Sequence, residues 1–340
     1  LKSFIYAGLA AAVFTVTETP AAELHDCDRL AAHPDPALRV AGVAGVYLEE
    51  IDSAMAIGAC EAAVASVPQE PRFRFQLGRA LDAAVRRDDA IAAYEKAADA
   101  GHLRAHYNAA DLHLLYKDDE AARRDKAIAL LRVLAAAGDG WSQYRLGRLL
   151  LSGDIARLTD WATARTGSPA AAAEYPQIRD GLAQLEASSA QGFAEASLAL
   201  ARVWRAAESA RTPEEREGAR VARWYETAAR QGLATAQHEF ATELEGGWNL
   251  ARYLPEAARW YERAARQGYV PAQANLGRFI QLGLGVEADL VQAHAWTSLA
   301  SDGGRHNLGF RLEALEKQMS DADMSRARAL ARAFRPVVEY

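Results

Sequence analysis

A glycine that ends an alanine-rich segment returns along this chain at nearly regular intervals. The glycines are Gly101, Gly138, Gly192, Gly232, Gly268 and Gly304. Their spacings are 37, 54, 40, 36 and 36 residues. A repeat of this length is typical of helical arrays, in which one unit is too small to bury its own apolar face and must stack on its neighbours. The spacing therefore predicts an array of stacked units.

Residues at fixed distances from each glycine form columns of similar side chains. Four residues before the glycine stand Ala97, Leu134, Ser188, Ala228, Ala264 and Ala300. Four residues after it stand Ala105, Ser142, Ala196, Ala236, Ala272 and Leu308. Eight residues after it stand Ala109, Leu146, Leu200, Phe240, Leu276 and Leu312. Offsets of four and eight lie on one face of a helix. We therefore expect a helix on each side of the glycine, which suits a helix end because it adopts positive φ easily.

The composition agrees with an all-helical chain. Alanine is the dominant residue, and the strong helix formers leucine, arginine and glutamate are abundant, whereas aromatic residues make up only 8%. These residues lose little side-chain entropy in a helix. No stretch of alternating β-branched residues follows residue 23. The sequence predicts an all-α fold of stacked antiparallel helix pairs.

The best-formed unit covers residues 269–304. It reads Tyr-Val-Pro-Ala-Gln-Ala-Asn-Leu-Gly at 269–277 and Gly-Leu-Gly-Val at 283–286. Trp-Tyr-Glu occurs at 224–226 and again at 260–262, each time followed by an alanine pair and Arg-Gln-Gly. Leucine–glycine pairs stand at Leu77-Gly78 and Leu146-Gly147, in units that match more loosely.

These motifs resemble the Sel1-like repeat (SLR) family, whose members are related to tetratricopeptide repeats. The resemblance implies a right-handed α-solenoid that scaffolds protein complexes, with no enzymatic activity and no cofactor. It covers most of the chain, but its motifs are structural, so they specify the fold far better than the function.

The first 22 residues have the pattern of a secretory signal peptide. Lys2 precedes an apolar run from Phe4 to Val16, and small residues, Ala21 and Ala22, precede Glu23. About 13 apolar residues form a helix of about 20 Å, too short for a hydrocarbon core of about 30 Å. We expect cleavage near Glu23, no membrane insertion afterwards, and a periplasmic or secreted protein. The alternative is a segment retained as an anchor.

The remaining sequence divides into three parts. Residues 23–66 are expected to form an N-terminal cap, residues 67–304 the repeats, and residues 305–340 capping helices. The cap holds both cysteines, Cys27 and Cys60. An even cysteine count in an exported protein indicates a disulfide, and two free buried thiols are the alternative. An insertion near 152–178 either carries recognition or only lengthens a helical hairpin.

Charge and motifs exclude several classes of function. The net charge is −6, and the arginines are interleaved with acidic residues, so a basic surface that binds nucleic acid is not predicted. His102, His106 and His113 share a predicted helix, but their spacing suits solvated or hydrogen-bonded histidines better than a tetrahedral metal site. The aspartates beside Cys27 disfavour a reactive thiolate. No convergent acid, base and nucleophile set is found, so no catalytic residue and no metal ligand is predicted.

Polar residues five and seven positions after the glycines are the candidate partner-binding residues. They are His106, Asn108, Gln143, Arg145, Gln237, Glu239, Gln273 and Asn275. In related solenoids the first helix of each pair lines the concave face, where varied polar side chains can clasp a peptide. The alternative is an ordinary solvated helix face. The tryptophans at 224, 260 and 296 could form a row on which a ligand stacks. Their position in the core column of the repeat predicts that they pack in the core instead.

The sequence thus predicts a scaffold or regulator in the periplasm that binds a partner protein or peptide in its concave groove. A membrane-anchored sensor or a cell-wall complex would be such a partner. The alternative is a hydrolase acting on the cell wall or on peptides, built on the same solenoid.

Overall fold

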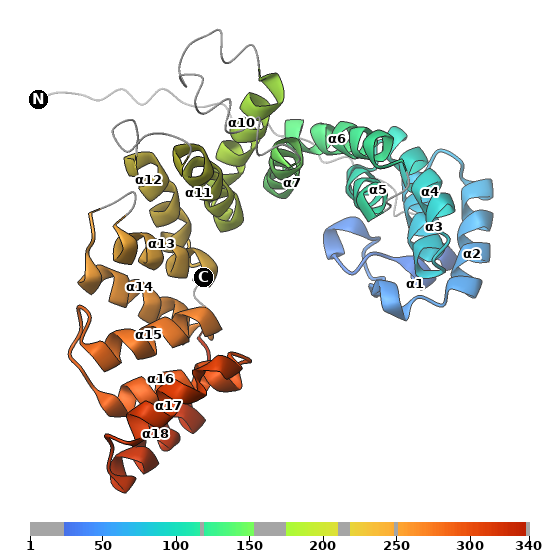
Figure 1. Ribbon diagram of the computed structural model, residues 1–340. Coiled ribbons are helices and arrows are strands. Elements are labelled where there is room, and N and C mark those ends of the chain that lie inside the picture. The colour runs from blue at the N-terminus through green and yellow to red at the C-terminus, as the bar shows by residue number, and fades with distance from the viewer. Residues whose placement is uncertain (1–23, 116–118, 153–174, 210–217, 248–250, 338–340) are drawn as a thin grey trace, which may run out of the picture. The chain divides into compact units, whose positions relative to one another are not determined.

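The computed structural model describes residues 24–115, 119–152, 175–209, 218–247 and 251–337. Within these ranges every regular element is a helix, and successive helices pack as pairs (Figure 1). The prediction of an all-α fold of stacked helix pairs is confirmed. The predicted signal segment at 1–22, and the insertion over residues 153–174, lie outside the described residues. The chain forms two compact units, Leu1–Leu115 and Tyr116–Tyr340.

The first unit contains the N-terminal cap and the first helix pairs. Its elements are α1 (Asp26–Ala31), η1 (Pro36–Leu38), η2 (Leu48–Glu50), α2 (Ser53–Ser66), α3 (Pro71–Ala83), α4 (Arg87–Asp99) and α5 (Leu103–Leu115). Helix α3 packs against α1, α2 and α4, so it is the centre of this unit.

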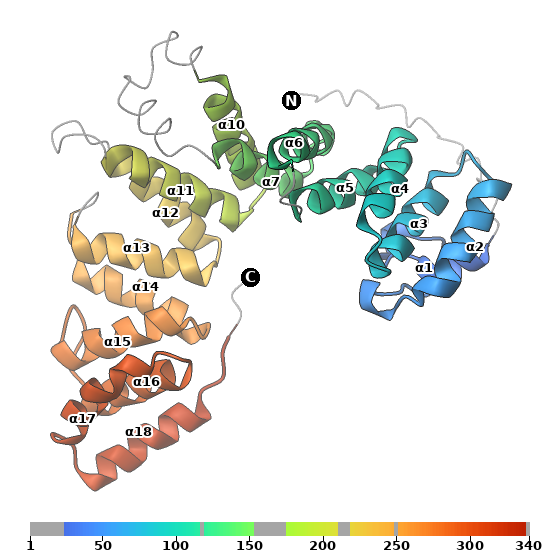
Figure 2. The ribbon, with the colours of Figure 1, turned by 45° about the vertical axis from the view of Figure 1, so that its right-hand side comes forward.

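The second unit continues the array. Its elements are α6 (Glu120–Ala136), α7 (Gly140–Leu151), α10 (Pro176–Ala190), α11 (Ala194–Ser209), α12 (Gly218–Arg230), α13 (Ala234–Gly246), α14 (Leu254–Arg266), α15 (Val270–Leu282), α16 (Leu290–Asp302), η4 (His306–Leu308), α17 (Gly309–Glu316) and α18 (Asp321–Ala333). Helices α13 to α16 lie in successive layers (Figures 1 and 2). One continuous apolar core runs from Tyr144 to Leu315. Among the described residues, no helix is both long and apolar enough to span a membrane.

Each repeat glycine ends a helix in the way the sequence predicts. All of them have φ between 85° and 103°. At Gly268, the following residue Tyr269 donates its N–H to the carbonyl of Ala264 over 3.1 Å, and Gly268 donates to Ala265 over 3.0 Å. These bonds cover carbonyls at the helix end that have no partner within the helix. The turn therefore joins one helix to the next without leaving buried polar groups unpaired.

The glycines of the pairs Leu77-Gly78, Leu146-Gly147 and Leu276-Gly277 serve a different purpose, because their helices cross the next helix there. A Cβ atom on Gly78 would lie 2.5 Å from the ring of Tyr94, and one on Gly277 would lie 2.6 Å from Thr297 Oγ1. A Cβ atom on Gly147 would lie 2.8 Å from both the carbonyl oxygen of Gly181 and Leu185 Cγ. Only glycine leaves room for such a close helix crossing.

The tyrosine column, rather than the tryptophan column, forms the centre of the core. Tyr94, Tyr225 and Tyr261 are fully buried. Trp260 is also buried and packs on Phe240 with ring centroids 5.5 Å apart, but Trp224 and Trp296 are only partly buried. The tryptophans pack as predicted, yet they border the core that the neighbouring tyrosines fill.

The N-terminal cap is held to α3 by buried polar groups. The Arg79 guanidinium donates to the carbonyls of Ala31, Ala32 and Val46 over 2.5–2.8 Å. The buried Asp28 carboxylate accepts from Gln76 Nε2 at 3.0 Å and from Arg72 Nε at 3.2 Å. These bonds provide partners for polar groups of an irregular segment that forms few backbone–backbone hydrogen bonds of its own.

A disulfide joins the two helices of the cap. Cys27 in α1 and Cys60 in α2 are bonded, with a Cα–Cα distance of 4.6 Å, and both are fully buried. The structure therefore contains the predicted disulfide and not the two free thiols.

The C-terminal end of the array is closed by α17, α18 and the segment that follows. Ser320 Oγ accepts from the N–H of Asp323 over 3.2 Å, so this serine caps the start of α18. After α18, Phe334 packs edge-on against Trp296, and Val337 donates its N–H to the Arg266 carbonyl over 3.0 Å. These contacts cover side chains and a helix end that the last repeat would otherwise expose.

We expect Gly147→Ala to destabilise the second unit by about 1–3 kcal/mol, because the added methyl group meets a backbone carbonyl that cannot rotate away. Urea unfolding of the full chain measures this loss. Gly309→Ala is the matched control, since Gly309 begins α17 with no atom within 4 Å of the added carbon. Equal stability of both variants would contradict the close crossing.

We expect Cys60→Ser to lower the stability of the first unit by about 3–4 kcal/mol, the chain-entropy value for a loop of this length. The measurement is thermal unfolding of the oxidised protein and the variant, with the reduced wild-type protein as control. Thiol labelling of unfolded, unreduced wild-type protein should modify neither cysteine. Labelling of both would disprove the disulfide.

Candidate functional site

The first helices of successive pairs in the second unit are joined by a row of polar side chains. Arg202 on α11 forms an ion pair with Glu239 on α13, and its Nε donates to both carboxylate oxygens over 3.2 Å. On the other side of α13, Arg278 of α15 lies 2.6 Å from Glu245. Asn275 of α15 contacts His238 of α13 at 3.1 Å. This face is therefore polar and internally paired.

The buried tyrosines of the second helices reach the same row. Tyr225 donates its hydroxyl to Glu239 over 3.1 Å, and Tyr261 donates to Glu245 over 2.8 Å. Burial, followed by the charge of the adjacent glutamate, raises the pKa of Tyr225 far above its usual value. The tyrosines therefore stay protonated and act as hydrogen-bond donors that hold each glutamate towards its arginine.

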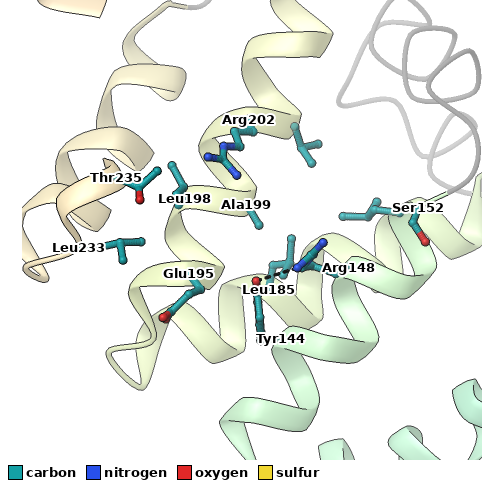
Figure 3. A pocket seen from close by; sticks show the side chains of 12 residues that line it. Tyr144, Arg148, Ser152, Leu185, Glu195, Leu198, Ala199, Arg202, Leu233 and Thr235 are labelled. Atoms are coloured by element: carbon teal, nitrogen blue, oxygen red, sulfur yellow. Dashed lines mark hydrogen bonds between the residues drawn. The ribbon is translucent and has the colours of Figure 1, made fainter. Parts of the chain in front are cut away.

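A pocket of about 560 Å³ opens beside this row, between α7, α11 and the start of α13 (Figure 3). Tyr144, Arg148, Leu151 and Ser152 come from α7 and its end, Leu185 comes from α10, and Glu195, Leu198, Ala199, Arg202 and Val203 come from α11. Leu233 and Thr235 complete it. Its size suits a small ligand or a few residues of a peptide.

Two charged side chains of this pocket, Arg148 and Glu195, have no counter-ion among the described residues. Arg148 is exposed, and its Nη1 donates to the Tyr144 hydroxyl over 3.1 Å (Figure 3). Glu195 is also exposed. Within the described part of the chain, neither forms an ion pair. Leucine, alanine and valine side chains make up most of the remaining lining, so the pocket combines an apolar surface with a cation and an anion that have no ion-pair partner among the described residues.

The structure places the predicted position-five residues inside the array. Gln143, Gln237 and Gln273 are buried, and each donates its Nε2–H to the carbonyl eight residues earlier, over 3.2 or 3.3 Å. His106, the member of this column in the first unit, is also buried. These amides bind each of these first helices to the end of the preceding helix.

The position-seven residues lie nearer to solvent. Asn108, Arg145, Glu239 and Asn275 are partly buried. Positions five and seven are about 200° apart around a helix, so one column faces inward when the other faces outward. The residues that line the pocket stand three, six and ten positions after the glycine, as Glu195, Tyr144 and Arg148 do. This spacing of three to four residues was the signal that could have identified them.

The histidines that the sequence analysis considered as metal ligands make separate contacts. His102 stacks on Phe75 with ring centroids 4.1 Å apart, and His113 Nε2 lies 2.8 Å from Glu95. The described residues contain no group of three or more side chains suited to hold a metal ion.

We expect Glu239→Gln to reduce the acid sensitivity of the second unit. Burial would raise the pKa of Glu239, but the hydrogen bonds and charges of Arg202, aided by Tyr225 and Arg205, hold it below the usual 4.5. A carboxyl with a lowered pKa contributes stability that is present above its unfolded value and lost as the pH falls through the folded value.

The melting temperature of wild-type protein should therefore fall more steeply than that of the variant below about pH 4.5. Glu226→Gln is the control, because Glu226 pairs only with Arg230 on the exposed face of α12. Such exposed pairs contribute about 0.3–0.5 kcal/mol. Identical acid sensitivity of Glu239→Gln and wild-type protein would contradict this role.

Comparisons with known proteins agree with this architecture. The model of the Sel1 repeat matches residues 86–102, 142–158, 222–233, 244–269 and 270–304. Among solved structures, the chain is similar to a protective antigen of uropathogenic Escherichia coli strains with an SLR fold, at a TM-score of 0.57 and 22% identity. The match covers 91% of this chain and 60% of that one, so this chain spans about three fifths of that protein.

A Sel1 repeat protein from Oxalobacter formigenes is also similar, at 29% identity and a TM-score of 0.35, over 39% of this chain and 97% of its own. No curated protein matches the sequence significantly.

Proposed function

We propose that this helical solenoid, which the model of the Sel1 repeat matches over five segments, is a non-enzymatic scaffold or regulator that holds a segment of a partner protein. The proposal rests on one observation, the pocket between α7, α11 and α13. Sel1 repeats typically mediate protein interactions, and this pocket lies on the face formed by the first helices of the pairs.

The chemistry of the pocket defines the segment that fits it. The floor of leucine, alanine and valine favours an apolar side chain, which loses contact with water when it binds. The free Arg148 favours a carboxylate on one side of that side chain, and the free Glu195 favours a basic residue on the other. The expected partner segment therefore carries an apolar residue between an acidic and a basic one.

We include the position-seven residues among the proposed partner-binding residues. We leave out the glutamines at position five, because they are buried. Arg145 stands on α7, and Glu239 pairs with Arg202 at the pocket wall. Asn108 and Asn275 extend the same helix position in the neighbouring repeats. We expect them to contribute less, because contacts at the rim of an interface are weaker than those in its centre.

The proposed compartment is the periplasm or the exterior of the cell. A disulfide between Cys27 and Cys60 persists in an oxidising environment. The apolar segment at 4–16, with Lys2 before it, supports export in the same way. A membrane-anchored sensor or a cell-wall complex would meet the chain there.

We expect Arg148→Gln to weaken partner binding at least about tenfold, because removing a centrally placed charge of an interface costs 1.4 kcal/mol or more. The partner is first captured from periplasmic extract on immobilised full chain and identified by mass spectrometry. Calorimetry with the purified partner then measures affinity. Arg230→Gln on the outer face of α12 is the matched control and should bind like wild-type protein.

Two results would contradict this proposal. If Arg148→Gln retains full affinity while deletion of 153–174 abolishes binding, recognition belongs to the insertion. If no protein is captured and the purified chain turns over a wall fragment or a peptide, the hydrolase alternative replaces the scaffold.

A further inference from the structure

A second pocket, of about 400 Å³, lies within the first unit. Three segments enclose it: the loop around η1, the start of α3 and the start of α5. Its lining residues are Ala37, Leu38, Arg39, Val40, Pro71, Arg72, Gly101, His102, Leu103 and Arg104. It shares no lining residue with the proposed partner pocket, so it is a separate candidate site.

The three arginines that line this pocket differ in the groups that contact their guanidinium charges. Arg72 contacts the carboxylates of Asp28 and Glu70 at 3.2 and 3.3 Å. Arg39 instead donates to the carbonyls of His33 and Pro34, which carry no net charge. Arg104 lies over the Tyr107 ring at 4.6 Å, and its buried Nε has no hydrogen-bond partner. Within residues 24–115, neither Arg39 nor Arg104 has a carboxylate in ion-pair range.

Neighbouring groups indicate a positive potential near the pocket. Arg79, buried beneath the cap, is bound by three carbonyls. Burial, followed by the charges of Arg79 and Arg104, lowers the pKa of His33 to about 4, despite the opposing charge of Asp35. Helix α5 also begins at the pocket, and the free N–H groups of a helix start favour negative charge. A bound anion would face Arg104, whose Nε has no hydrogen-bond partner, and the start of α5.

We propose that this pocket binds a small organic acid, with the carboxylate held by Arg104 and Arg39 and the apolar part against Leu38, Val40 and Leu103. Guanidinium groups bind carboxylates through paired, charge-assisted hydrogen bonds, which neutral carbonyls replace only in part. The apolar lining residues distinguish an acid with a hydrocarbon group from an inorganic anion. Leu103 is 55% exposed, so it has surface left to cover.

The test uses the full chain and N-acetyl-L-leucine, which joins a carboxylate to an apolar side chain. Saturation-transfer NMR and calorimetry should detect saturable binding. N-acetyl-L-leucinamide, which lacks the charge, and inorganic phosphate, which lacks the apolar group, should each bind at least about tenfold more weakly. Such a preference requires both halves of the proposed site.

Arg104→Gln should weaken binding of N-acetyl-L-leucine at least about fivefold, since it removes the unpaired guanidinium. Leu103→Ser tests the apolar half at an exposed position and should weaken binding about threefold. Arg86→Gln is the matched control, because Arg86 pairs with Asp89 on the exposed start of α4, outside the pocket. Far-UV circular dichroism confirms that each variant is folded.

The proposal is overturned by any of three results. The first is the absence of saturable binding of N-acetyl-L-leucine at concentrations up to about 50 mM, because a specific site of this kind would have a lower dissociation constant. The second is equal binding of the amide or of phosphate. The third is unchanged affinity in both folded pocket variants.

Discussion

The close approach of paired helices is the constraint on which this fold depends. At Gly147 and Gly277 one helix presents no side chain at all, and the facing helix fills that space with backbone or a short side chain. Alanine occupies most of the columns that surround these crossings and is fully buried there. Small side chains bring the helix axes together, so dispersion contacts are dense although few large residues are available. A single carbon atom added at one of these glycines disturbs the packing of the two helices at that crossing.

Buried polar groups give this small-residue core its specificity. The tyrosine hydroxyls, the glutamates of α13 and the arginines of the adjacent helices form chains of charge-assisted hydrogen bonds. The glutamine amides bind helix-end carbonyls in the same register in three of the repeats. An alanine surface permits helices to slide past one another, whereas a hydrogen bond requires one alignment. These bonds therefore fix the register that the alanines leave open.

The two pockets differ in the way their charges are balanced. Along the first helices of the second unit most charges are paired within the array, so the exceptions, Arg148 and Glu195, define the face that a partner can read. In the first unit, Arg39 of the cap and Arg79 of α3 donate to carbonyls, and no described carboxylate forms an ion pair with either guanidinium. The disulfide holds α1 against α2 beside α3, where Arg79 binds the carbonyls that follow α1. A cap that secures the array thus also encloses a positively charged pocket.

The sequence by itself determined the turns, the packing columns, the disulfide partners and the start of α18. These features depend on local chemistry: a glycine at positive φ, side chains four residues apart, and a serine that caps a helix. Only the tertiary structure decided which polar column faces outward. Gln143 and Arg145 are equally polar in sequence, but the rotation of α7 against its neighbours buries the first and leaves the second nearer to solvent. The roles of Arg79 and Arg104 were likewise hidden, because they depend on segments that are distant in sequence and meet only when the helices stack.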